Sequence, residues 1–171
     1  NREPRSGARP PSPPMFNAPR VILLLCAVMI GIHALRVILP ANLNQEILFY
    51  GAVIPARYWG DQSASLLGLI GPLFTYAFLH ADVMHVGLNS IWLLALGTPV
   101  ARRLSLGRFF GLFFASSIVG AVVHILMYGP SNGALIGASG AIAGLMGAAV
   151  RFALFVPGGY AAAFKYGFNG G

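Results

Sequence analysis

Two short segments of the chain hold side chains that could together carry out acyl transfer at a serine. Ser139 stands among small residues, in Gly137-Ala-Ser139-Gly140, and a serine hydroxyl is a nucleophile once a neighbouring base takes its proton. His85 and Asn89 are four residues apart, so they share one helix face and could donate hydrogen bonds to an oxyanion. For each group alone, the alternative is a packing role between helices.

The composition predicts that these segments belong to a membrane protein. Of the 171 residues, 57% are hydrophobic and only 9% are charged, whereas a soluble domain carries about a quarter charged residues. The net charge of +7 would suit nucleic acid, but the arginines flank apolar runs instead of forming a basic stripe with aromatics. We therefore expect the lipid bilayer as the surroundings and no nucleic-acid partner. A single cysteine, Cys26, excludes an internal disulfide.

Four apolar runs are each close in length to the roughly 20 residues that cross a bilayer core as a helix. They predict an all-α polytopic transmembrane helix bundle. The predicted helices cover residues 21–39, 77–97, 109–128 and 135–156. Residues 1–19, rich in proline, are expected to form a disordered cytoplasmic arm, and residues 157–171 a C-terminal tail or the start of a connecting loop. Arg36 is expected to snorkel from the first helix to the nearer surface. Segment 41–71, rich in aromatics, is either an external loop or lies in the outer leaflet.

Basic residues indicate the orientation of the helices. Arg20 precedes the first helix, and three arginines lie in the turn 102–108 between the second and the third. These residues fall on one side of the membrane, and the excess of basic residues on cytoplasmic loops puts that side, with the N-terminus, in the cytoplasm. His85, Asn89 and Ser139 then lie at a similar depth in the outer half of the bilayer. His80, nearer the outer end, could be merely interfacial.

A stripe of glycines runs along the fourth predicted helix. Gly137, Gly140, Gly144 and Gly147 are spaced by three, four and three residues, so they share a face. This spacing predicts a smooth surface on which another helix packs backbone to backbone.

The pattern His80-x-x-x-x-His85-x-x-x-Asn89, followed by Gly137-Ala-Ser139-Gly140, resembles the rhomboid family of intramembrane serine proteases. The arginine-bearing turn 102–108 fits this resemblance, which covers roughly residues 20–156. The resemblance implies a transmembrane domain of six or more helices, of which four are present in this chain.

The resemblance also implies the chemistry. The family uses a Ser–His dyad, without a metal or another cofactor, to cut single-span transmembrane protein substrates. By this resemblance Ser139 is the nucleophile, and His85 and Asn89 stabilise the oxyanion together with the backbone N–H of Ser139. His80 matches a supporting histidine.

The general base is expected to be missing from this chain. In the family it is a histidine on a sixth helix, whereas His33, His80, His85 and His124 all precede Ser139. We therefore expect a chain truncated before the last helices and inactive alone, with His124 as a less favoured substitute base. The alternative is a rhomboid-superfamily protein that binds membrane clients without cutting them. A channel would need an acidic ring or a buried ion pair within the spans, and a zinc protease a His-Glu-x-x-His motif; the sequence has neither, and it favours no oligomeric state.

Overall fold

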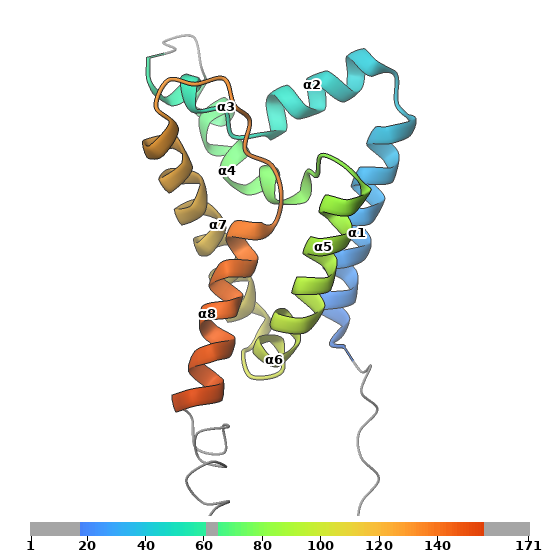
Figure 1. The fold of residues 1–171 in the computed structure, drawn as a ribbon, viewed down its shortest axis with the longest axis vertical. Coiled ribbons are helices and arrows are strands. Elements are labelled where there is room, and N and C mark those ends of the chain that lie inside the picture. The colour runs from blue at the N-terminus through green and yellow to red at the C-terminus, as the bar shows by residue number, and fades with distance from the viewer. Residues whose placement is uncertain (1–17, 61–64, 156–171) are drawn as a thin grey trace, which may run out of the picture.

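A computed structural model of the protein describes residues 18–60 and 65–155 (Figure 1). The regular secondary structure within these ranges is helical, and one isolated antiparallel bridge joins Val53 and Leu135. The expected all-α helix bundle is therefore confirmed. Nearly all of the expected arm 1–19, and the tail 157–171, lie outside the described ranges. The elements are α1 (Arg20–Ile38), α2 (Ala41–Gly51), η1 (Pro55–Tyr58), α3 (Leu66–Ile70), α4 (Pro72–Thr75), η2 (Tyr76–Phe78), α5 (Val83–Trp92), η3 (Leu93–Gly97), α6 (Thr98–Ala101), α7 (Leu106–Tyr128) and α8 (Ser139–Phe155).

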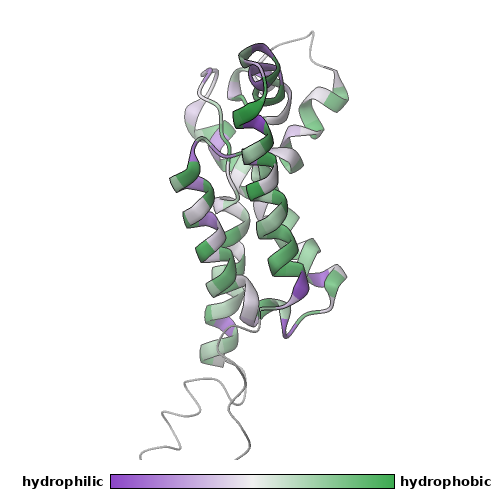
Figure 2. Ribbon diagram, turned by 90° about the vertical axis from the view of Figure 1, so that its right-hand side faces the viewer, coloured by the Kyte–Doolittle hydropathy of each residue, from purple (hydrophilic) through white to green (hydrophobic). Residues whose placement is uncertain are grey.

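Among residues 18–60 and 65–155, three helical stretches are long and apolar enough to cross a membrane. They are α1, the continuous stretch Val83–Ala101 and α7, and shorter apolar stretches cover Leu66–Phe78 and Ser139–Leu154. Many of their apolar residues are exposed, among them Leu24 and Met127, and Figure 2 shows that hydrophobic residues predominate along these helices. Such an outer surface is stable in lipid and not in water. In Figure 1 the start of α1 and the turn between α6 and α7 lie at the same end of the bundle.

The second predicted helix begins later than the sequence indicated. Its α-helical part starts at Val83 instead of residue 77, because Asp82 caps it: the Asp82 carboxylate accepts a hydrogen bond of 2.8 Å from the His85 N–H. The residues before it form the 3-10 turn η2 and an extended segment. Near its other end the helix passes through a π-helical turn, η3, just before Pro99. Proline cannot donate the helical hydrogen bond, so the wider turn accommodates the interruption.

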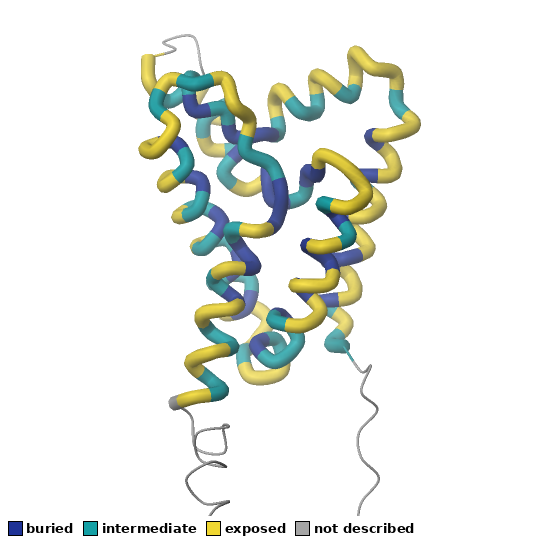
Figure 3. The backbone as a smooth tube through the Cα atoms, in the orientation of Figure 1, coloured by how far each residue is buried: buried dark blue, intermediate teal, exposed yellow. Residues whose placement is uncertain are grey.

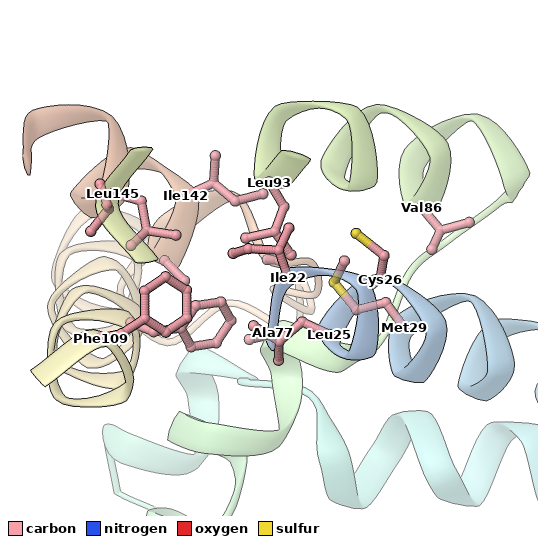
Figure 4. Close-up of a cluster of buried hydrophobic side chains, with 14 residues drawn as sticks. Ile22, Leu25, Cys26, Met29, Ala77, Val86, Leu93, Phe109, Ile142 and Leu145 are labelled. Atoms are coloured by element: carbon pink, nitrogen blue, oxygen red, sulfur yellow. The ribbon is translucent and has the colours of Figure 1, made fainter. Parts of the chain in front are cut away.

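The main core lies where α1 and α8 pack against the stretch Val83–Ala101. Ile22 and Met29 of α1, Leu93 of η3 and Leu145 of α8 are fully buried in one apolar cluster, and Figure 4 shows the labelled side chains converging from these elements. In Figure 3 the dark buried segments line the inner faces of the same helices. The close approach depends on Gly97, where an added Cβ would lie 2.8 Å from Ile22 Cδ1. This packing fixes α5, which carries two of the candidate site residues.

Two glycines of the predicted stripe, Gly140 and Gly144, lie where α8 packs against α7. A Cβ on Gly144 would overlap the side chain of Ser116, and a Cβ on Gly140 would lie 3.7 Å from Gly120 Cα. Beyond its own helix, no atom of the described residues lies within 4 Å of a Cβ on Gly147. The fourth glycine, Gly137, precedes the helix and packs elsewhere.

The described residues of segment 41–71, which are 41–60 and 65–71, form helices instead of a simple connector. Helix α2 lies obliquely across the end of the bundle where α1 stops (Figure 1), and η1 follows it. Two aromatic residues anchor η1 to its surroundings: Tyr58 Oη donates to the carbonyl of Leu69 at 2.7 Å, and Trp59 Nε1 to that of Ile125 at 3.1 Å. These bonds tie the outer segment to α3 and α7.

Candidate active site

The loop before α8 descends into the protein and delivers Ser139 at the start of the helix. Leu135 exchanges two backbone hydrogen bonds with Val53, of 2.8 and 3.2 Å, and the Gly137 N–H donates to the Tyr76 carbonyl at 2.9 Å. Gly137 has a φ of +111°, which favours glycine and ends the extended path. The helix therefore begins at Ser139 and not at the predicted residue 135. The Ser139 side chain is exposed.

His85 lies directly against this loop. An ideal Cβ on Gly137 would be 2.6 Å from His85 Nε2 and 2.9 Å from Cε1, so the ring occupies the space of a side chain at position 137. His85 is half-buried, on the first turn of α5. Although 54 positions separate them in the sequence, His85 thus reaches the backbone two residues before Ser139.

The hydrogen bonds of His85 decide which ring nitrogen carries the proton. The Ala81 N–H donates to His85 Nδ1 at 3.4 Å, so Nδ1 acts as an acceptor. In a neutral imidazole the other nitrogen is then the donor. The Nε2–H of His85 therefore faces the Gly137 backbone and is directed towards the start of α8.

Asn89 lies one turn further along α5 on the same side. It is buried, and its amide Nδ2 donates to the His85 carbonyl at 2.9 Å. The same Nδ2 would be 3.8 Å from a Cβ on Gly137. His85 and Asn89 thus present two N–H donors to one stretch of backbone, as expected from their shared helix face and depth.

His80 is packed inside the protein against the ring of His85. It lies before α5, is fully buried, and its ring stands edge-on to His85 with centroids 5.0 Å apart. Burial, and next the nearby His85, lower the pKa of His80 from 6.5 to about 4, because a charged ring would lose its hydration. His80 is therefore a neutral ring that supports the position of His85.

His124 is the other histidine near the serine. Together with Ser139 it lines a cavity of about 220 Å³ between α7 and α8. Its ring packs against Tyr128 with centroids 4.5 Å apart, and its Nε2 is buried without a hydrogen-bond partner among the described residues. A larger cavity of about 740 Å³, between α1, α2 and α3, contains none of the candidate site residues.

Two residues near the site were not singled out from the sequence as site residues. Tyr76 Oη donates to the Ser117 carbonyl at 2.7 Å and lies against Gly140, directly after Ser139. Arg36 was expected to snorkel, and this prediction is wrong. Its side chain is buried, with Nη1 donating to the His80 carbonyl at 2.8 Å and Nε to Asn44 Oδ1 at 3.0 Å. An arginine within an apolar run was the available signal, since such a charge needs a partner.

Comparison with known proteins identifies the family. The family model for the Rhomboid domain matches residues 65–165, more than half of the chain. The chain belongs to the rhomboid family. It is an integral, multi-pass membrane protein, as the family and its apolar helices together show.

Several curated relatives of this rhomboid chain are named as proteases. The chain is 37% identical over 82 residues to rhomboid protease GluP of Bacillus subtilis, covering 48% of this chain and 16% of the relative. It is 38% identical over 80 residues to rhomboid-like protease 1 of Toxoplasma gondii, covering 47% of this chain and 27% of the relative. Rhomboid protein 1, mitochondrial, of Saccharomyces cerevisiae is 31% identical over 121 residues, covering 61% of this chain and 33% of the relative. The chain therefore spans a third or less of the length of these relatives.

Proposed function

We propose that the protein is an intramembrane serine endopeptidase that uses Ser139 as nucleophile, with transmembrane proteins as substrates. The observation that carries this proposal is the contact of His85 with Gly137, which brings a ring N–H donor to the backbone beside a serine at a helix start. The protease names of the relatives support the reaction type at the level of the family.

In this proposal the oxyanion is stabilised by three donors. The first N–H groups of a helix have no partner within it, so the Ser139 N–H is available for the purpose. The Nε2–H of His85 and the Nδ2–H of Asn89 complete the set, and His80 supports His85 from below. Such donors act best where water is excluded, and all three are preorganised by hydrogen bonds or a helix end.

The general base in this proposal lies outside residues 1–171, on a segment that would cover the exposed side of Ser139. His124 is the alternative within the chain, supported by the cavity that it shares with Ser139. The exposure of Ser139 is consistent with a base on a further segment and with His124 as the base, because the hydroxyl has free space beside it among the described residues.

The experiment uses the full-length gene product that contains these residues, purified in detergent and given a fluorogenic transmembrane substrate. Ser139→Ala should abolish both cleavage and labelling by a fluorophosphonate probe. Ser105→Ala is the matched control: it removes an exposed serine hydroxyl that makes no capping hydrogen bond at the opposite end of the bundle, and it should leave both unchanged. Cleavage that survives Ser139→Ala would refute the proposed nucleophile. A folded wild type that binds but never cleaves its substrate would favour the client-binding alternative.

A further inference from the structure

Arg36 on α1 is buried at the level of the candidate site, and the mechanism above gives it no role. A buried arginine in a membrane helix is costly unless its hydrogen bonds are satisfied. Its Nη1 donates at 2.8 Å to the carbonyl of His80, 44 positions away along the chain. His33 lies three residues earlier on the same face, and its Nδ1 is 3.3 Å from the same carbonyl oxygen. Two donors from α1 therefore converge on one acceptor.

This carbonyl belongs to the turn that precedes α5. His80 lies before the cap residue Asp82, so its carbonyl is outside the hydrogen-bond ladder of the helix. The contacts with α1 therefore fix the orientation of the peptide group between His80 and Ala81.

The other end of that peptide group reaches the candidate oxyanion donor. In a planar trans peptide, C=O and N–H point in opposite directions. The His80 carbonyl faces Arg36, and the Ala81 N–H of the same peptide donates to His85 Nδ1 at 3.4 Å. Fixing one end thus directs the other, and that bond makes Nδ1 the acceptor and Nε2 the donor.

We propose that Arg36 is a positioning residue, which acts through the His80–Ala81 peptide to hold His85 with its Nε2–H directed at the oxyanion position beside Gly137. Arg36 touches no reacting atom; its cationic group holds and polarises the peptide, and the peptide holds the ring. This inference rests on the proposed function of His85 as an oxyanion donor.

The test is a double-mutant cycle in the full-length gene product, measured as kcat on a transmembrane substrate and as the rate of fluorophosphonate labelling. Arg36→Met keeps the length of the side chain and removes its donors. We expect this substitution to lower both rates about tenfold and to leave KM little changed. The loss is smaller than the hundredfold or more that removal of an oxyanion donor costs, because His85 is still present. In a His85→Ala background the same substitution should change the rates less than about twofold, because the group through which it acts is gone.

Two further variants separate positioning from general damage. Arg36→Lys keeps a cationic donor for the carbonyl and should recover most of the lost rate. Arg57→Met is the matched control, since Arg57 stacks 3.9 Å above the Phe49 ring and has no contact with the His80 turn; it should leave the rates within about twofold. Equal losses from Arg36→Met with and without His85 would overturn the inference, as would a loss that Arg36→Lys does not relieve. A wild type without Ser139-dependent turnover would instead overturn the proposed function.

Discussion

The imidazole of His85 occupies the position that a side chain on residue 137 would need, with Nε2 only 2.6 Å from an ideal Cβ there. Glycine is thus required at position 137 for two reasons: the contact with His85, which is far away in the sequence, and the backbone φ of +111°.

Gly137→Ala should therefore damage both the fold and the site. The strained backbone alone costs about 1–3 kcal/mol, and His85 must move away from the loop. We expect a lower unfolding midpoint in detergent and a fall of about a hundredfold or more in fluorophosphonate labelling of the full-length protein. Gly133→Ala is the control in the same loop, because a Cβ there meets only Ser131 Oγ at 3.8 Å. Normal labelling of Gly137→Ala would show that His85 is not needed beside the serine.

The donor pair itself is tested by His85→Ala and Asn89→Ala. Each should raise the barrier by about 2.7–4 kcal/mol, as for an oxyanion donor in a soluble serine protease, while membrane levels remain near normal. The measurement is kcat on a transmembrane substrate. Full activity in both variants would leave the two residues with packing roles only.

Packing of α8 against α7 should depend on Gly144 and not on Gly147. Alanine at 144 overlaps Ser116, and overpacking of this kind costs about 1–3 kcal/mol. Alanine at 147 meets no atom within 4 Å and should be neutral or slightly stabilising, because alanine is the better helix former. Unfolding in mixed micelles measures both. Equal stability of the two variants would contradict the packing assigned to Gly144.

The buried His80 predicts a loss of stability in acid. An unfolded histidine has a pKa near 6.5, whereas burial lowers the pKa of His80 to about 4 in the folded protein. Between these pH values His80 binds a proton in the unfolded chain but not in the folded protein. The contribution of neutral His80 to the free energy of unfolding is therefore fully present above about pH 6.5 and decreases towards pH 4. His80→Asn should show a flatter dependence of the unfolding midpoint on pH in this window. An identical slope in both proteins would contradict the assignment.

Orientation can be tested with single cysteines in a Cys26→Ala background. We expect position 105, in the arginine-bearing turn, to be cytoplasmic and position 132, in the loop before α8, to face the outside. An impermeant thiol reagent on intact cells should then label Asn132→Cys and not Ser105→Cys. The reverse result would invert the topology.

The spans, and the shared helix face of His85 and Asn89, could be predicted because their signals are local. Apolar runs of the right length predicted α1 and α7, and the spacing of four predicted that His85 and Asn89 share a face. The start of α8 could not be predicted, because residues before Ser139 are apolar but are held extended by Val53 and Tyr76, far away in the sequence. The burial of Arg36 was not predicted for a similar reason. Its partner is a backbone carbonyl, and because every residue has one, the sequence does not indicate which carbonyl will accept the hydrogen bond.

The contacts that orient His85 have a consequence for biosynthesis. Arg36, the Ala81 amide and the Asp82 cap all precede the histidine, so these groups, which position its ring and its backbone, have been translated by the time His85 is added to the chain. Chains that fold from the N-terminus during synthesis can therefore place His85 once the first two spans pair in the membrane. The ribosome still has to add about fifty residues before Gly137 is made, and the backbone at Gly137 then packs against a ring that is already in place.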